Sequence, residues 1–258
     1  MHILLTNDDG IQAPGLWALY NRLVKNHKIS VIAPDREQSA IGHAITLNQP
    51  LRANRVSMNG NCSGYAVSGT PADCVKLGVL ELLESKPDML ISGINPGANV
   101  GVNINYSGTV AAAKEGALYG IMAMAVSCMG SGADQYDDVA AFVAKLAVKV
   151  AENGLPFGTF LNINIPDVPI RKIRGIRISK LSVKFFPESV DKRVDPRQRT
   201  YYWQGCDSLP VSDNPEIDGT ALSDKYISIT PITCDVTDYH VFEAMKGWGL
   251  DGLASKKK

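Results

Sequence analysis

Two adjacent carboxylates stand near the start of the chain, where they could bind a metal ion. Asp8 and Asp9 directly follow the apolar run at residues 2–5, which we predict to be part of the first strand. Hard divalent cations prefer oxygen ligands, and ligands of open α/β sheets bind at the carboxyl ends of strands. Neighbours on a strand point to opposite faces, so both carboxylates serve one site only if the chain has already turned at Asp9, which Gly10 makes easy. The alternative is that one aspartate caps the helix beginning near Pro14 and the other is solvated.

Two neutral oxygen donors are predicted to lie close to this pair. Ser39 falls in the loop after the second expected strand, residues 29–33, and Asn95 follows the expected strand at residues 88–92. Either residue alone is more often a turn former. Their common placement at strand ends favours an all-oxygen site, which suits Mg²⁺, Mn²⁺ or Ca²⁺ far better than zinc or copper.

A third group of residues could hold an anion. Ser107, Gly108 and Thr109 precede or begin an expected helix at residues 109–119. Backbone N–H groups at a helix start are unpaired, the helix dipole favours negative charge there, and a glycine lets phosphate approach the backbone closely. Ser107 could equally be the helix cap, and the two roles are compatible. No P-loop, dinucleotide-binding or nucleophile-elbow motif is present.

The elements that must position these residues alternate over roughly the first two thirds of the chain. We expect strands at residues 3–7, 29–33, 44–47, 51–56, 65–67, 88–92, 121–128 and 160–165, and helices at 14–26, 71–83, 109–119 and 137–152. Thr70 is expected to cap the second helix, and Asp73 and Glu115 to be surface or capping charges. This alternation predicts a three-layer α/β fold with a mostly parallel, doubly wound, Rossmann-like sheet.

The last third has a different pattern. Short strand-like stretches occur across residues 171–205, residues 206–223 are rich in turn formers, and a strand at 226–230 precedes a helix at 236–245. We expect one α/β domain over residues 1–258. Its core is predicted to span residues 1–180, and its C-terminal extension, residues 181–258, to carry a hairpin arm and a terminal helix.

Composition excludes several classes of protein. Among the 258 residues, Lys plus Arg and Asp plus Glu both number 26, so the basic surplus of a nucleic-acid-binding protein is absent. The five cysteines are scattered and form no C-x-x-C pair, which favours a reduced, cytoplasmic protein over a zinc or disulfide framework. We expect no signal peptide and no membrane span, because no apolar run approaches the roughly 20 residues required.

Several spaced motifs resemble one known family. They are Leu-Thr-Asn-Asp-Asp-Gly-Ile at 5–11, Ala-Pro-Gly at 13–15, Ala-Pro-Asp-Arg at 33–36, Ser-Gly-Thr-Pro-Ala-Asp-Cys-Val at 68–75, Ile-Ser-Gly-Ile-Asn-Pro-Gly-Ala-Asn-Val-Gly at 91–101, Tyr-Ser-Gly-Thr-Val-Ala-Ala-Ala-Lys-Glu-Gly at 106–116 and Leu-Asn-Ile-Asn-Ile-Pro at 161–166. In this order they resemble the survival protein SurE family of 5′/3′-nucleotidases, which is related to some acid phosphatases. The resemblance covers most of residues 1–166 and is looser beyond residue 180, although residues 226–231 match a late family strand.

The resemblance implies a metal-dependent phosphomonoesterase that hydrolyses nucleoside 5′- and 3′-monophosphates and other small phosphate monoesters. The family's metal ligands carry over onto Asp8, Asp9, Ser39 and Asn95, with one divalent ion, Mg²⁺ or Mn²⁺ before Ca²⁺, in each subunit. The phosphate would be held by Asn95, Ser107, Gly108 and Thr109. Asp8 and Asp9 are the catalytic candidates, and whether a carboxylate attacks, acts as base or only ligates stays open. No residue stands out as the acid for the leaving group.

One departure from the family pattern concerns the loop shape. The family's serine is often followed by glycine, whereas Ala40 follows Ser39 here. A backbone that needs a positive φ at this position would be strained by alanine.

Two other functions share these ligands. A nucleotide-binding regulatory protein could use the same metal–phosphate site with little turnover. A metal-dependent nucleotide-sugar transferase is the weaker alternative, because such enzymes usually place their carboxylates as Asp-x-Asp.

Five large aromatic residues predict self-association. They flank a charged stretch that contains Pro187 and Pro196, and they are Phe185, Phe186, Tyr201, Tyr202 and Trp203. Exposed apolar surface of this kind usually marks a contact site, although an intramolecular flap over the sheet edge is the alternative. The resemblance implies dimers and tetramers formed through arms in this region. We expect a homodimer or homotetramer whose interface includes Phe185, Phe186 or Trp203.

Overall fold

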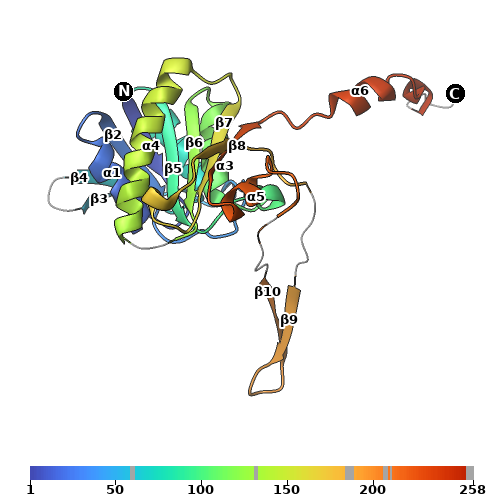
Figure 1. The fold of residues 1–258 in the computed structure, drawn as a ribbon, viewed down its shortest axis with the longest axis horizontal. Helices are drawn as coiled ribbons and strands as arrows, with labels where there is room; N and C mark the ends of the chain where they lie inside the picture. The colour runs from blue at the N-terminus through green and yellow to red at the C-terminus, as the bar shows by residue number, and fades with distance from the viewer. Residues whose placement is uncertain (59–61, 131–132, 184–188, 206–208, 210, 254–258) are drawn as a thin grey trace.

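A nine-stranded sheet forms the centre of the protein (Figure 1). The computed structural model describes residues 1–58, 62–130, 133–183, 189–205, 209 and 211–253. The sheet strands are β1 (His2–Thr6), β2 (Lys28–Pro34), β3 (Ala53–Met58), β4 (Cys62–Val67), β5 (Met89–Pro96), β6 (Met122–Cys128), β7 (Thr159–Ile165), β8 (Ile176–Ile178) and β11 (Ile227–Thr233). Their spatial order is β3-β4-β2-β1-β5-β6-β7-β11-β8. A separate two-stranded hairpin joins β9 (Ser189–Val194) to β10 (Thr200–Gly205).

The strand pairing is mostly parallel, as the alternation predicts. Strands β4, β2, β1, β5, β6 and β7 are parallel to their neighbours in that order. In the register Thr6, the last residue of β1, lies beside Ser92, and β5 continues to Pro96. The antiparallel pairs of this sheet are β3 with β4 and β7 with β11, while β8 pairs parallel to β11.

Helices cover both faces of the sheet. Alternate residues of β1 enter two separate cores: Ile3 and Leu5 pack with the helices α1 (Pro14–Leu23) and α4 (Ala133–Asn153). Leu4 packs with α2 (Pro71–Leu77) and α3 (Gly108–Leu118) on the other face. The three-layer, doubly wound prediction is therefore confirmed.

Two helix starts follow directly from their sequences. Thr70 caps α2 in a capping box, since its hydroxyl accepts from the Asp73 amide while the Asp73 carboxylate accepts from the Thr70 amide. Ser107 caps α3 by accepting from the amide of Val110. The shorter helices are η1 (Gly78–Leu82), η2 (Gly101–Asn105), η3 (Ile170–Lys172), α5 (Asp218–Ser223), α6 (Tyr239–Met245) and η4 (Leu250–Leu253).

Some elements differ from expectation. Residues 44–47 form no strand, because side chains hold them instead: the Thr46 amide and hydroxyl donate to Asp73, and the Thr70 hydroxyl donates to the Ala44 carbonyl. Strand β5 continues to Pro96 rather than ending at residue 92. The turn-rich stretch at 206–223 contains α5, whose six residues are too few to show a helical period.

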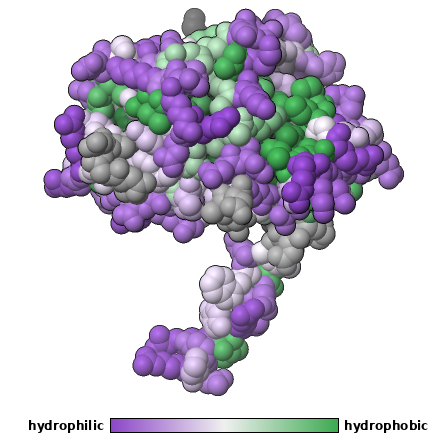
Figure 2. Space-filling model, turned by 60° about the vertical axis from the view of Figure 1, so that its left-hand side comes forward, coloured by the Kyte–Doolittle hydropathy of each residue, from purple (hydrophilic) through white to green (hydrophobic). Residues whose placement is uncertain are grey.

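Two segments project from the body. The β9–β10 hairpin extends away from the sheet (Figures 1 and 2). Helix α6 lies at the end of an extended segment on another side (Figure 1). All side chains of the hairpin strands are exposed. Strand β11, by contrast, lies inside the sheet between β7 and β8. Among the described helices none has the length and apolar character that crossing a membrane requires.

Candidate active site

Asp8 is held at the start of α3. It follows β1 by two residues, is only 6% exposed, and accepts two hydrogen bonds from Thr109, the second residue of that helix. The Thr109 hydroxyl lies 2.5 Å from Oδ1, and the Thr109 amide nitrogen lies 3.0 Å from Oδ2. Burial raises the pKa of the Asp8 carboxyl, and the hydrogen bonds from Thr109 oppose that rise. The contact fixes the orientation of this carboxylate.

Gly108 allows the contact to form. A Cβ atom at this position would lie 2.7 Å from Cβ of Asp8 and 3.0 Å from its Oδ2, with Cγ of Pro71 also at 3.0 Å. No side chain fits there unless Asp8 moves. Ser107 uses its oxygen to cap α3, with the Val110 amide 3.2 Å away, so the capping role is confirmed and the anion-binding role stays a prediction.

Asp9 is the carboxylate without a partner. It is half-buried, and among the described residues no donor reaches its buried Oδ2 atom. Burial, then the charge of Asp8, then that of Glu37 raise the pKa of Asp9 from 3.8 to about 7. Neither aspartate caps α1, whose cap position is Ala13 and receives no side-chain bond. The capping alternative is therefore wrong, and a cation would relieve the repulsion between these carboxylates.

Ser39 lies in a loop that is attached to the same strand end. The amide of Gln38 donates to the Asp8 carbonyl over 2.7 Å. The Ser39 hydroxyl is exposed and donates to Oε1 of Glu37 over 2.5 Å, which leaves its own oxygen available as an acceptor. The next residue, Ala40, has φ of 55°, so the left-handed turn that glycine would favour is present with alanine in it.

Asn95 is the penultimate residue of β5 and lies beside Ser127 of β6. Its side-chain nitrogen donates to the carbonyl of Gly97 over 2.9 Å, which leaves the amide oxygen available for another group. The helix α1 packs close to this strand, because a Cβ on Gly15 would lie 2.3 Å from the carbonyl oxygen of Ile94. Because β1, β2 and β5 are parallel, these donors lie toward the same edge of the sheet, and their binding of one metal ion stays a prediction.

Sequence reasoning missed the residues that hold the loop after Asn95. The Asn99 amide donates to Asn164, its side chain donates to Ser127, and its carbonyl accepts from both Asn162 and Asn164. Asn162 and Asn164 are fully buried in β7. Two asparagines in an otherwise apolar strand were the available signal, since a buried amide requires partners.

Glu115 was also misjudged. It is buried in α3, and its carboxylate lies 2.8 Å from Nε2 of His43 and 4.0 Å from Nζ of Lys76, so the surface-charge prediction is wrong. Asp73, by contrast, is the predicted capping charge.

His43 and Ser107 line a small hollow of about 110 Å³. A larger hollow of about 510 Å³ shares Ile104 and Asn105 with it.

The donor set fits a hard cation. Among the described residues no three His, Cys, Asp or Glu side chains gather to hold a metal, so an ion here would rest on Asp8 and Asp9 with neutral oxygens completing its shell. The unpartnered Oδ2 of Asp9 and the paired negative charges support that fit. These four residues offer neither the sulfur nor the imidazole ligands that softer metals prefer.

Known proteins resemble this chain over nearly its whole length. A family model described as Survival protein SurE matches residues 3–188. A protein of Desulfatibacillum aliphaticivorans named 5′-nucleotidase SurE is 52% identical over 251 residues, covering 97% of this chain and 99% of its own. One of the same name from Syntrophobacter fumaroxidans is 47% identical over 250 residues, covering 97% and 100%.

A solved structure agrees with the fold. The crystal structure titled as the Sure protein from Aquifex aeolicus superposes with a TM-score of 0.82 at 36% sequence identity, covering 95% of this chain and 98% of that one. The family model spans well over half of the residues, and the matched range contains Asp8, Asp9 and the start of α3. The chain belongs to the SurE family.

Proposed function

We propose that this protein is a 5′-nucleotidase, a phosphomonoesterase that hydrolyses nucleoside 5′- and 3′-monophosphates to nucleoside and phosphate. The observation that carries the proposal is the pair of carboxylates at the start of α3, one oriented by Thr109 and the other without a partner. The names of the curated relatives, 5′-nucleotidase SurE, support it. Those names speak against the regulatory alternative.

The activity would require one divalent metal ion in each subunit. Asp8, Asp9, Ser39 and Asn95 would hold it, and Mg²⁺ or Mn²⁺ suits these oxygens better than Ca²⁺, because phosphoryl transfer favours a small, strongly polarising ion. When bound, the ion would polarise a phosphate oxygen and neutralise charge that develops during transfer.

The residues of the chain supply position and charge balance. Thr109 fixes Asp8, so this carboxylate is already oriented before a ligand arrives. Asp9 retains an oxygen that can accept a proton from a water molecule or bind a cation. The amides that begin α3, with Ser107 and Asn95, would hold the phosphate, because the helix N-terminus attracts anions. Phosphoryl transfer depends mainly on such positioning.

Substrate discrimination is expected to be modest. The two hollows beside Ser107 and Asn105 have mostly apolar walls, to which Ile104 and Ile232 contribute, although polar side chains such as Thr233 also line them. Apolar walls pack against a base without reading its hydrogen-bonding edge. Simple aryl phosphates should therefore also turn over. A preference of more than about 10⁴-fold for one nucleotide would contradict this, because such ratios require buried base-specific hydrogen bonds.

The protein would act as a cytoplasmic homodimer or homotetramer. The free thiols of Cys74, Cys128 and Cys234 suit a reducing compartment. Tyr202 and Trp203 are 60% and 61% exposed on a two-stranded hairpin, an element that is marginally stable in water without further packing. The apolar side chains of Phe242 and Trp248 beside or within α6 are likewise half or more exposed. A second copy would bury both surfaces.

The decisive experiment is phosphate release by the purified protein across a panel of nucleoside 5′- and 3′-monophosphates and p-nitrophenyl phosphate, each with Mg²⁺, Mn²⁺, Ca²⁺ or chelator. We expect turnover with Mg²⁺ or Mn²⁺ and none in excess chelator. Tight nucleotide binding without phosphate release would instead identify a regulatory protein.

A further inference from the structure

We infer that Asp218 is a positioning residue for the phosphate-binding start of α3, although it lies in the C-terminal part of the chain. The inference rests on the proposed function. Asp218 is the first residue of α5 and is fully buried. A buried carboxylate is costly unless it is hydrogen-bonded, so its partners indicate what it stabilises.

The Asp218 carboxylate joins two segments that are far apart in the sequence. Oδ2 accepts the amide of Gly101 over 2.6 Å, across a separation of 117 positions. Oδ1 accepts the amide of Gly219 over 2.9 Å and that of Ser182 over 3.4 Å. One side chain therefore binds the loop after β5 and the segment after β8 together.

Gly101 begins the segment that leads to the site. The helix η2 starts at Gly101 and ends at Asn105, and Ser107 then caps α3. Before Gly101, the loop is fixed by Asn99, which is bonded to β6 and β7. Asp218 thus fixes the start of the segment that leads to the amides that would hold phosphate, and the Gly42 amide, which donates to the Tyr106 carbonyl over 2.8 Å, fixes its end.

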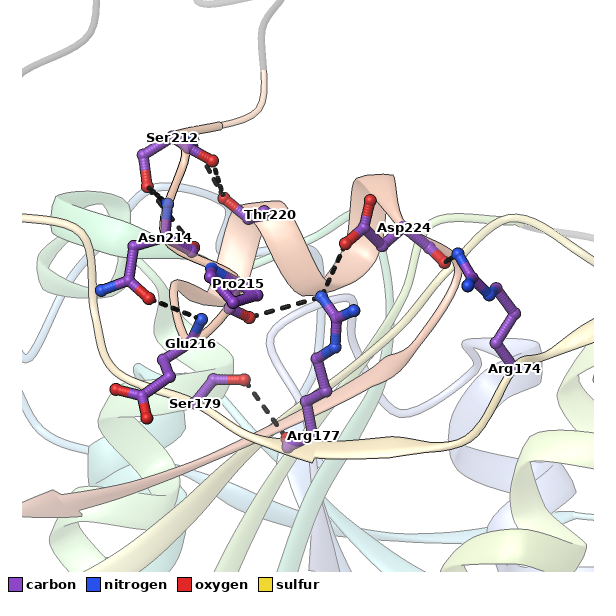
Figure 3. Close-up of polar contacts among 9 residues, drawn as sticks. All are labelled: Arg174, Arg177, Ser179, Ser212, Asn214, Pro215, Glu216, Thr220 and Asp224. Atoms are coloured by element: carbon purple, nitrogen blue, oxygen red, sulfur yellow. Dashed lines mark hydrogen bonds and ion pairs between the residues drawn. The ribbon is translucent and has the colours of Figure 1, made fainter.

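The helix α5 is itself rigidly mounted (Figure 3). The Thr220 hydroxyl accepts from the Ser212 amide over 2.9 Å and donates to its carbonyl over 3.1 Å. From β8, Arg177 donates to Asp224 at the end of α5 over 2.7 Å and to the Pro215 carbonyl over 3.4 Å. The Arg177 guanidinium also lies 3.9 Å from the ring centre of Tyr226. The Thr220 bonds hold the beginning of α5, which carries Asp218, whereas the Arg177 contacts hold its far end.

Replacing Asp218 by asparagine tests the inference at nearly constant volume. An amide nitrogen would then face either the Gly101 amide or the amides of Ser182 and Gly219, so one group of donors loses its acceptor. We expect kcat/KM for 5′-AMP to fall about 10- to 100-fold, because small displacements of positioning groups have effects of this size. Inhibition by inorganic phosphate should weaken in parallel, while calorimetric Mn²⁺ affinity stays unchanged.

The matched control is Asp224→Asn in the same helix. It removes an ion pair that is 42% exposed on the carboxylate side and touches no residue of the loop after β5. It should leave kcat/KM and phosphate inhibition at the wild-type level. If a folded D218N enzyme keeps wild-type kcat/KM and phosphate inhibition, the inference is overturned.

Hydrogen exchange supplies a readout that does not depend on catalysis. In D218N the amides of residues 101–106 should exchange faster than in the wild type and in D224N, and unchanged exchange would overturn the inference. If D218N does not fold, hydrogen exchange in the wild-type protein still tests the inference. The amides of Gly101 and Ser182 should then exchange through one common opening event, because both donate to the Asp218 carboxylate. Exchange through independent opening events would overturn the inference. If the wild type releases no phosphate from any ester, the proposed function fails, yet these exchange measurements still test the role of Asp218.

Discussion

The Thr109 hydroxyl lies 2.5 Å from Oδ1 of Asp8, and the amide nitrogen of the same residue lies 3.0 Å from Oδ2. One residue at the start of α3 therefore determines the direction in which a carboxylate at the end of β1 points. This relationship ties the candidate metal ligand and the candidate phosphate-binding helix into one unit.

Thr109→Val should lower kcat/KM about 10- to 100-fold, the usual effect of removing a group that orients a metal ligand. The shape of the side chain is retained, and only the hydroxyl donor is lost. Steady-state kinetics at saturating Mn²⁺ measure the effect, and Thr109→Ser should restore most of the activity. Equal activity of the valine and serine variants would show that the hydroxyl does not position Asp8.

Asp8→Asn and Asp9→Asn should each lower kcat about 100-fold or more, because each removes a formal charge that would hold a divalent ion. The fold should persist, and calorimetry should show weakened Mn²⁺ binding. Asp35→Asn is the control, since Asp35 is an exposed carboxylate that comes directly after β2. Full activity of the wild-type protein in excess chelator would end the metal hypothesis.

The metal-free protein should lose stability as the pH rises from about 4 to about 7. The pKa of Asp9 is raised from 3.8 to about 7 in the fold, so the native state holds a proton that the unfolded chain has already released across this window. Asp9→Asn should remove this slope and stabilise the metal-free protein above neutral pH by the order of 1 kcal/mol, after discounting for solvent screening. Thermal melts in chelator at several pH values measure it, and parallel curves for wild type and variant would contradict it.

Gly108→Ala should destabilise the protein and impair catalysis together. The added Cβ would lie 2.7 Å from that of Asp8, so the carboxylate must move before any phosphate arrives. We expect a cost of about 1–3 kcal/mol, typical of overpacking, and weaker inhibition by inorganic phosphate. Gly247→Ala, with only a backbone oxygen at 3.6 Å, is the control and should be silent. Unaltered phosphate inhibition in G108A would place the anion elsewhere.

Trp203→Ser combined with Tyr202→Ser should lower the mass measured by light scattering, because both side chains are exposed on the hairpin. Phe185 and Phe186, also predicted to be in the interface, lie outside the described residues. Phe157→Ser is the control, since Phe157 is 79% exposed but lies on the body, next to the hollow beside α3 and β7. A wild-type protein that is monomeric at tens of micromolar would contradict the self-association prediction.

The sequence predicted the fold well where local patterns decide it. The parallel strands are apolar runs, Thr70 and Ser107 have the residue types of helix caps, and both caps are present. The aspartates and the start of α3 were placed at one sheet edge because parallel strands end on the same side. The sequence left the shape of the loop at Ala40 open, and its φ of 55° shows that the left-handed conformation is kept.

What the sequence did not reveal depends on contacts between distant segments. Asp218 lies in a stretch that is rich in turn-forming residues, and the neighbouring sequence does not indicate that its carboxylate accepts the Gly101 amide. Glu115 looked like a solvated helix residue because its partner, His43, lies 72 positions earlier in a loop. Thr46 lies in a short run whose β-branched residues favour a strand. Its amide and hydroxyl instead donate to the Asp73 carboxylate, and these hydrogen bonds keep the segment in a loop conformation.

The position of β11 has a consequence for biosynthesis. Strand β7 ends at Ile165 and β11 begins at Ile227, so residues 166–226 are translated while the edge of β7 has no neighbour. Strand β8 is synthesised within that interval, but in the folded sheet it pairs with β11 and not with β7. It therefore does not protect the free edge of β7 before β11 is made. At about 5–20 residues per second, a ribosome leaves this edge open for about 3–12 seconds. An unpaired edge invites pairing with other chains, so nascent chains should depend on chaperones most strongly in this interval.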